Sequence, residues 1–199
     1  MSADKAGGEP KKADLPSRIL AIAAAIVVLA AAGALLAVMP ARDPIGGPFA
    51  LEAAGGETVT DADFKGHPFL VYFGYTHCPE VCPTTLADIA EALRKIPEAP
   101  IRALFITVDP ERDSPAVMAD YVSGFDKRFV GLSGSPERIA AAEKAYRVYA
   151  HKGPPQSDGG YSIDHSSIVY LMDKNGAFVE WLDLRRPPED TAKELSAYL

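Results

Sequence analysis

Apolar and polar positions divide the chain into one long uncharged stretch followed by a series of shorter elements. Residues 19–39 run for 21 positions without a charged side chain. At a rise of about 1.5 Å per residue, a helix of that length reaches roughly 31 Å, the thickness of the hydrocarbon core of a membrane. We therefore predict a transmembrane anchor at 19–39.

A cleaved secretory signal is the competing interpretation of this stretch. The small residues ending at Ala41 suit a signal peptidase, but a signal has an apolar core of only about 7–15 residues, so the length favours a retained anchor. Four basic residues precede the stretch, which predicts a cytoplasmic tail over 1–18. Acidic residues in that tail argue against a mitochondrial transit peptide. We expect a single-pass protein of a bacterial inner membrane, with its C-terminal domain in the periplasm.

Behind the anchor, proline and glycine mark a linker and apolar patterning marks a domain. The segment PARDPIGGP is the predicted linker at 40–48, and the remaining residues, 49–199, are enough for one domain with a full core. The first part of this domain, around Gly55 and Gly56, has the pattern of a short hairpin, followed by a helical turn over 61–64.

The best strand of the domain is PFLVYFGYT at 68–76, a continuous apolar run typical of a strand buried on both faces. A helix follows it, and a second buried strand is predicted at 101–109. The later elements are a helix capped by Ser114, a short strand near 129–134, a helix from about Ser135, a hairpin over 166–184 and a final helix over 188–199. The two strands of this hairpin are joined at residues 174–176 by a turn that needs positive φ at Gly176. This order predicts an α/β fold with a central mixed sheet flanked by helices.

Charge excludes one class of partner. The chain has a net charge of −7, and residues 1–39 contribute +1, so the exported part carries −8. A surface this acidic argues against binding to nucleic acid.

The two cysteines, Cys78 and Cys82, lie where the best strand gives way to a helix. A structural staple is a weak explanation for them, because a disulfide that closes so short a loop contributes little chain entropy. Residues i and i+4 share one face of a helix at a separation of about 6 Å, within disulfide range, and a helix N-terminus favours the thiolate, above all at Cys78. We therefore predict a redox-active or metal-binding pair.

Two thiolates prefer Cu(I), zinc or an iron–sulfur cluster, and two are too few for a four-cysteine cluster. A further ligand must then come from one of four histidines. We expect His67 and His151 in loops and His77 as a modulator of Cys78, which leaves His165 with ligand and structural roles equally open. A structural zinc site that uses His77 as a fourth ligand lacks the usual spacing.

Three motifs, GYTHCPEVCPTTL, TVDPERDSP and DHSSIVYLMD, occur in this order. In these motifs the chain resembles the Sco/SenC family of copper-binding assembly proteins for cytochrome c oxidase, over about residues 45–199 and in its anchor. The resemblance implies a thioredoxin-like fold in which Cys78, Cys82 and His165 bind Cu(I) or Cu(II). Thioredoxins carry a cis-proline in the loop facing their cysteines, whereas the segment around His165 has no proline.

Two thiolates and an imidazole suit Cu(I), while Cu(II) favours a fourth donor such as water or a carboxylate. By the same resemblance, Asp109 tunes the site or contacts a partner, although capping of the following turn explains it equally well. The settings of Met118 and Met172 favour core packing over metal ligation.

Two functions are implied. The first is a metallochaperone that delivers copper to the dinuclear copper centre of cytochrome c oxidase subunit II, supplied by a copper donor protein. The second is a thiol–disulfide reductase for the cysteines of that centre, in which Cys78 attacks, Cys82 resolves and a periplasmic thiol reductant restores the pair. A peroxidase of the peroxiredoxin type is disfavoured, because the segment THCPEVC does not supply both the threonine and the arginine that its reactive cysteine needs.

Overall fold

A computed structural model describes residues 15–38, 44–156 and 159–199, and the chain divides into two compact units between Asp43 and Pro44. In the first unit, helix α1 spans Leu15–Val38, and the side chains described in it are those of residues 19–30. Residues 19–38 of the predicted anchor lie on this helix, and no helix among the described residues is long and apolar enough to cross a membrane. Most of the predicted tail, residue 39 of the predicted anchor and residues 40–43 of the linker lie outside the described residues.

The second unit is built on a five-stranded mixed sheet with strand order β5-β4-β3-β8-β9. Strand β3 is parallel to β4 and antiparallel to β8, and β4 is parallel to β5. The strands are β3 (Phe69–Gly74), β4 (Arg102–Thr107), β5 (Phe129–Leu132), β8 (Val169–Met172) and β9 (Phe178–Trp181). The predicted mixed sheet with a closing hairpin is therefore confirmed.

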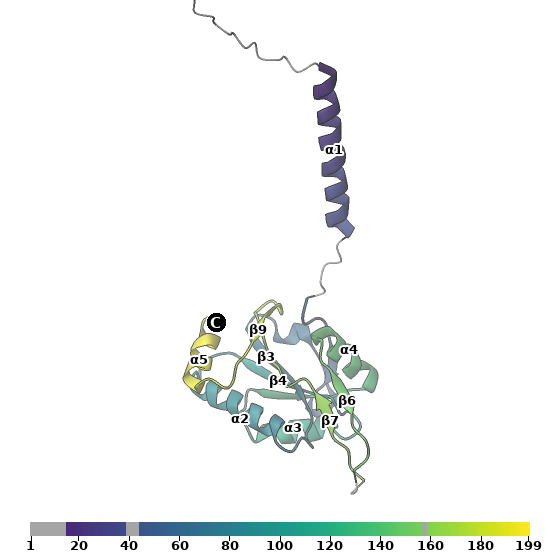
Figure 1. The fold of residues 1–199 in the computed structure, drawn as a ribbon. Coiled ribbons are helices and arrows are strands. Elements are labelled where there is room, and N and C mark those ends of the chain that lie inside the picture. The colour runs from purple at the N-terminus through teal and green to yellow at the C-terminus, as the bar shows by residue number, and fades with distance from the viewer. Residues whose placement is uncertain (1–14, 39–43, 157–158) are drawn as a thin grey trace, which may run out of the picture. The chain divides into compact units, whose positions relative to one another are not determined.

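Helices cover both faces of this sheet (Figure 1). They are α2 (Val81–Arg94), α3 (Pro115–Ser123), α4 (Pro136–Tyr146) and α5 (Pro188–Ser196). All six residues of β3 are buried, and alternate residues enter two separate cores. Leu70 and Tyr72 pack in the core formed with α2, α3 and α5, whereas Val71 and Phe73 pack in the core formed with α4. Continuous apolarity in β3 therefore reflects burial on two sides.

Local sequence signals account for the ends of several elements. Ser114 and Ser135 cap α3 and α4 by accepting hydrogen bonds from the backbone N–H groups of Val117 and Arg138. Gly176 has φ +80°, as the predicted turn between β8 and β9 requires.

An N-terminal hairpin extends the domain, as predicted. Strand β1 (Ala50–Glu52) pairs antiparallel with β2 (Thr58–Thr60), with a 3-10 turn at Ala54–Gly56 between them and another at Asp61–Phe64 after them. Contacts begin before this hairpin, because the N–H of Gly46 donates to the carbonyl oxygen of Ala145 on α4. Part of the segment assigned to a linker thus packs on the domain.

A second hairpin was not expected from the sequence. Strand β6 (Ala150–Lys152) pairs antiparallel with β7 (Ile163–His165) in a separate two-stranded sheet. The expectation that His151 lies in a loop is wrong, because residues 150–152 pair with residues 163–165. The same pairing places His165 at the end of a strand of its own, ahead of the predicted hairpin.

Candidate metal centre

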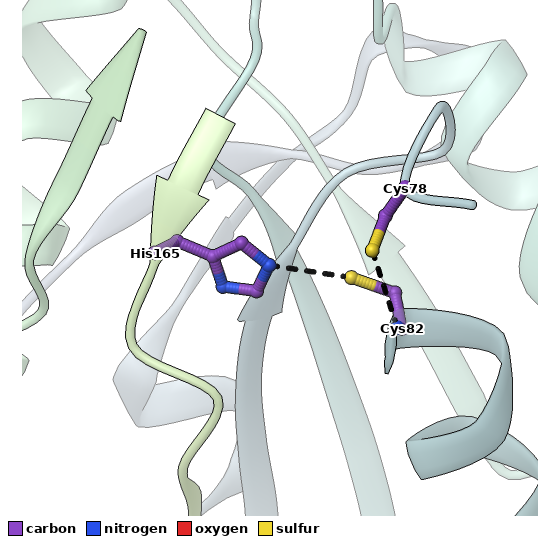
Figure 2. A group of neighbouring side chains, drawn as sticks. All are labelled: Cys78, Cys82 and His165. Carbon is purple, nitrogen blue, oxygen red and sulfur yellow. Dashed lines mark hydrogen bonds between the residues drawn. The ribbon is translucent and has the colours of Figure 1, made fainter. Parts of the chain in front are cut away.

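The two cysteines lie where β3 gives way to α2, as predicted. The backbone N–H of Cys78 donates to the carbonyl oxygen of Tyr75 at 3.2 Å, which forms a turn after the strand. Helix α2 begins at Val81, and the side chain of its N-cap residue, Glu80, accepts no hydrogen bond from the first N–H groups of the helix. The sulfur of Cys78 takes that role, accepting the N–H of Cys82 at 3.3 Å (Figure 2). Cys78 is thus fixed at the N-terminal end of the helix.

The two thiols differ in how deeply they are buried. Cys78 is partly exposed, whereas Cys82 is fully buried in the core beneath α2. This burial raises the pKa of the Cys82 thiol to about 12. Because a metal binds the thiolate, binding at Cys82 must displace a proton.

His165 approaches the cysteines from the opposite side, at the end of β7 (Figure 2). Its Nε2 lies 3.5 Å from the Sγ of Cys82, and its Nδ1 lies 3.2 Å from the carbonyl oxygen of Ser166. A carbonyl only accepts, so in this bond Nδ1 carries the hydrogen and Nε2 keeps its lone pair for a metal. Burial lowers the pKa of His165, which also favours the neutral, ligating form.

The three side chains fit a metal ion. Their ligand atoms all lie within 4.8 Å of one another, and they form the single group of this kind found among the described residues. An ion between atoms no farther apart than this lies within roughly 2.8 Å of each, so small shifts reach ordinary metal–ligand lengths of about 2.0–2.3 Å. Two sulfurs and one imidazole are soft to borderline donors, suited to copper or zinc rather than calcium or magnesium.

Asp113 supports the loop between β3 and α2 that carries Thr76 and Cys78, and the sequence did not identify this role. Its side chain is fully buried and accepts hydrogen bonds from the N–H and hydroxyl of Thr76 and from the hydroxyl of Thr107. It thereby ties the loop before Cys78 to the end of β4. No local spacing signals this role, because Thr76 lies 37 residues earlier.

The sequence left open whether Asp109 tunes the site, contacts a partner or caps the following turn. In the structure Asp109 belongs to a second network of hydrogen bonds and charged contacts. It is almost fully buried, pairs with the guanidinium of Arg112 and accepts the hydroxyl hydrogen of Tyr161 at 2.7 Å. Arg112 lies 3.6 Å from the centre of the Tyr161 ring, and Lys152 lies 3.9 Å from it. These contacts hold the β6–β7 hairpin, and therefore His165, against the loop that follows β4.

The other candidate residues lie away from the cluster. The side chain of His77 is 54% exposed, and its Nδ1 is 3.1 Å from the hydroxyl of Thr76, so the structure does not bring it to the cysteines as a fourth ligand. His67 is exposed, and His151 stacks on Tyr149. Met118 and Met172 are fully buried in the two cores, as expected.

The fold is thioredoxin-like, with a mixed sheet covered by helices on both faces and a Cys-x-x-x-Cys at the start of a helix. The two cysteines and His165 form a group of side chains that can bind a metal ion. The chain belongs to the SCO1/SenC family, whose model matches residues 37–199. The resemblance inferred from the three motifs is thus confirmed.

Individual relatives agree with this assignment. Protein SenC of Rhodobacter capsulatus is 36% identical over 197 residues, which cover 90% of this chain and 89% of that protein. The mitochondrial SCO2 homologue of Mus musculus is 40% identical over 157 residues, covering 77% of this chain and 62% of that protein. The chain spans only 48% to 62% of the length of this and similar mitochondrial relatives.

A solved structure shares the fold. The structure of Bradyrhizobium japonicum ScoI with copper bound superposes with a TM-score of 0.73 at 51% sequence identity, covering 78% of this chain and 99% of that one.

Proposed function

We propose that this chain is a copper metallochaperone that binds copper through Cys78, Cys82 and His165 and delivers it to the dinuclear copper centre of cytochrome c oxidase subunit II. The observation that carries the proposal is the convergence of two sulfurs and one imidazole nitrogen within 4.8 Å. Family membership and the copper in the related ScoI structure support copper over zinc. The oxidase as recipient follows from the family resemblance.

The arrangement suits transfer of an ion as cargo. Three donors match Cu(I), while Cu(II) takes a fourth from water or a carboxylate. Cys78 is the more exposed thiol, so a thiolate of the recipient can reach the ion from that side before Cys82 and His165 let go. Ligands are then exchanged one at a time, and the ion is handed over without being released to solvent.

The test is direct transfer. The full chain loaded with Cu(I) is mixed with the reduced, copper-free copper-binding domain of subunit II. Samples taken over time are oxidised with ferricyanide by one electron per dinuclear centre, because a centre that holds only Cu(I) is colourless, and the absorption of the oxidised centre is then measured. We expect the centre to form from the loaded chain, and a Cys82→Ser variant given the same total copper to do no better than free copper. Equal rates from loaded wild type and free copper would contradict delivery.

A thiol–disulfide reductase is the second candidate, because the structure has both cysteines free and one thiol at a helix N-terminus. In this reaction the Cys78 thiolate attacks a disulfide of the recipient, and one recipient thiolate leaves. Cys82 then attacks the mixed disulfide, releasing the reduced recipient and leaving a Cys78–Cys82 disulfide for a periplasmic thiol reductant to reduce. A His165→Ala variant separates the functions, because reduction needs no imidazole ligand and copper delivery does.

We also propose that the domain works in the bacterial periplasm, anchored by residues 19–39 in the inner membrane, where a copper donor protein supplies it. The support is the run of 21 uncharged residues and the basic residues before it. Alkaline extraction of membranes tests the anchor, and an alkaline phosphatase fused after residue 199 tests the side. Extraction into the soluble fraction, or an inactive phosphatase fusion, would contradict the proposal.

A further inference from the structure

Tyr72 is a polar side chain that touches the buried sulfur of the candidate metal centre without being one of its ligands. Its hydroxyl donates a hydrogen bond to the Sγ of Cys82 at an O···S distance of 3.7 Å, a length that suits the large sulfur atom. Tyr72 is 1% exposed, so solvent does not compete for this bond. Neither ligand spacing nor the three motifs explains a tyrosine hydroxyl at this position.

The position of this hydroxyl is fixed by the sheet. Tyr72 lies on β3 opposite Phe105 of β4 on one side and Val169 of β8 on the other. Its ring stacks on that of Phe105 with 5.7 Å between centroids, and the ring of His165 lies 6.4 Å away. A side chain held between two strands and two rings cannot swing away from Cys82 without disturbing the core.

The direction of the hydrogen bond is fixed once a metal is bound. A thiolate sulfur has no hydrogen, so it can only accept, and the hydroxyl of Tyr72 must be the donor. The hydroxyl of Thr85, on α2, donates to the oxygen of the same tyrosine hydroxyl. Tyr72 therefore keeps its own hydrogen for the metal-bound sulfur.

We propose that Tyr72 acts through Cys82 to favour Cu(I) over Cu(II) at this site, an inference that rests on the proposed copper binding. Cu(II) draws electron density from a thiolate more strongly than Cu(I) does, so the sulfur is the better acceptor in the Cu(I) state. A hydrogen bond to it stabilises that state more, and hydrogen bonding around a cysteine sulfur is a known means of tuning copper potentials. Tyr72 and the three-donor ligand set thus act in the same direction.

The experiment compares Tyr72→Phe with the wild-type full chain, each loaded with one copper ion. The substitution keeps the ring and its stacking and removes only the hydroxyl. Tyr146→Phe is the matched control, because Tyr146 is equally buried but lies in the other core against Phe73. The midpoint potential is measured by spectroelectrochemistry, in which the electrode supplies the one electron that converts Cu(II) to Cu(I), together with the sulfur-to-Cu(II) absorption band.

We expect Tyr72→Phe to reduce the preference for Cu(I) over Cu(II) roughly fivefold, the factor that an ordinary hydrogen bond contributes. At about 59 mV per tenfold for one electron, the midpoint potential should then fall by roughly 40 mV. The absorption band should move to longer wavelength, and Tyr146→Phe should change neither quantity. If Tyr72→Phe still binds copper and its potential and absorption band are unchanged, the role of Tyr72 is overturned and the proposed copper binding stands. Failure of the wild type to bind copper would overturn the proposed function and this inference together.

Discussion

The carboxylate of Asp113 accepts hydrogen bonds from both the backbone N–H and the hydroxyl of Thr76, and so ties the loop before Cys78 to the end of β4. All the hydrogen bonds that this buried carboxylate makes to Thr76 and Thr107 are accepted, and none is donated. An amide at this position would turn one acceptor into a donor facing other donors.

We therefore expect Asp113→Asn to lower the free energy of unfolding by about 1–3 kcal/mol, the cost of leaving buried donors without an acceptor. Copper affinity should also fall, because the loop that positions Cys78 loosens. Urea denaturation and copper titration measure the two effects. A variant as stable as the wild type would show that this carboxylate does not hold the loop.

Gly74, on β3, leaves room for the sulfur of Cys82. A Cβ added at this position would lie 2.7 Å from that sulfur and 2.7 Å from the ring of Phe105. Gly74→Ala should displace Cys82, lower the free energy of unfolding by about 1–3 kcal/mol through overpacking, and weaken copper binding. Gly124→Ala is the control, since its nearest atom is 3.8 Å away. Equal copper affinity in the two variants would contradict the role assigned to Gly74.

The ring of Tyr161 holds the β6–β7 hairpin through Arg112 and Lys152. Tyr161→Ala removes both contacts and the bond to Asp109, so hydrogen exchange over residues 150–165 should accelerate. Tyr161→Phe keeps the ring and should show a smaller change. If the two variants exchange equally fast, stacking on the ring is not what holds the hairpin.

Glu143, on α4, makes the free energy of unfolding of the domain depend on pH. Burial raises the pKa of its carboxyl to about 7, and the charged or titratable groups that line the same cavity are Asp109, Glu111, His151 and Lys152. The folded state therefore holds this proton more tightly than the unfolded state, whose carboxyl has an ordinary pKa. The contribution of the neutral Glu143 carboxyl to the free energy of unfolding is full below about pH 4.5 and is lost as the pH rises through about 7.

We accordingly expect Glu143→Gln to be more stable than the wild type at pH 8, by on the order of 1 kcal/mol after allowance for partial exposure, and to have little advantage at pH 5. Urea denaturation of both proteins at the two pH values is the measurement. The exposed Glu98→Gln serves as control. An advantage of Glu143→Gln that does not depend on pH would contradict this assignment.

Much of the fold could be predicted because its signals are local. The caps at Ser114 and Ser135, the turn at Gly176 and the apolar run of β3 each depend on neighbouring residues, and the structure confirms them. The position of Cys78 and Cys82 was likewise predictable from a local signal, the change from an apolar strand to a helix. The shared helix face expected for them is wrong, because α2 begins at Val81 and Cys78 lies in the turn before it.

The rest of the site depends on contacts between distant segments. His165 reaches the cysteines only because β7 pairs with β6, and neither three-residue strand has a pattern strong enough to predict. Tyr72 and Asp113 were missed for related reasons. Tyr72 lay within a strand that its apolarity already explained, and the partner of Asp113 lies on another loop.

The central claim is that Cys78, Cys82 and His165 together bind copper, and one copper titration tests it most directly. Reduced wild-type chain and His165→Ala are titrated with Cu(II) under anaerobic conditions, while thiol titration confirms that both cysteines remain available. The account predicts tight stoichiometric binding by the wild type and loss of tight Cu(II) binding by His165→Ala with its dithiol intact. Equal copper affinity in the two proteins would contradict it.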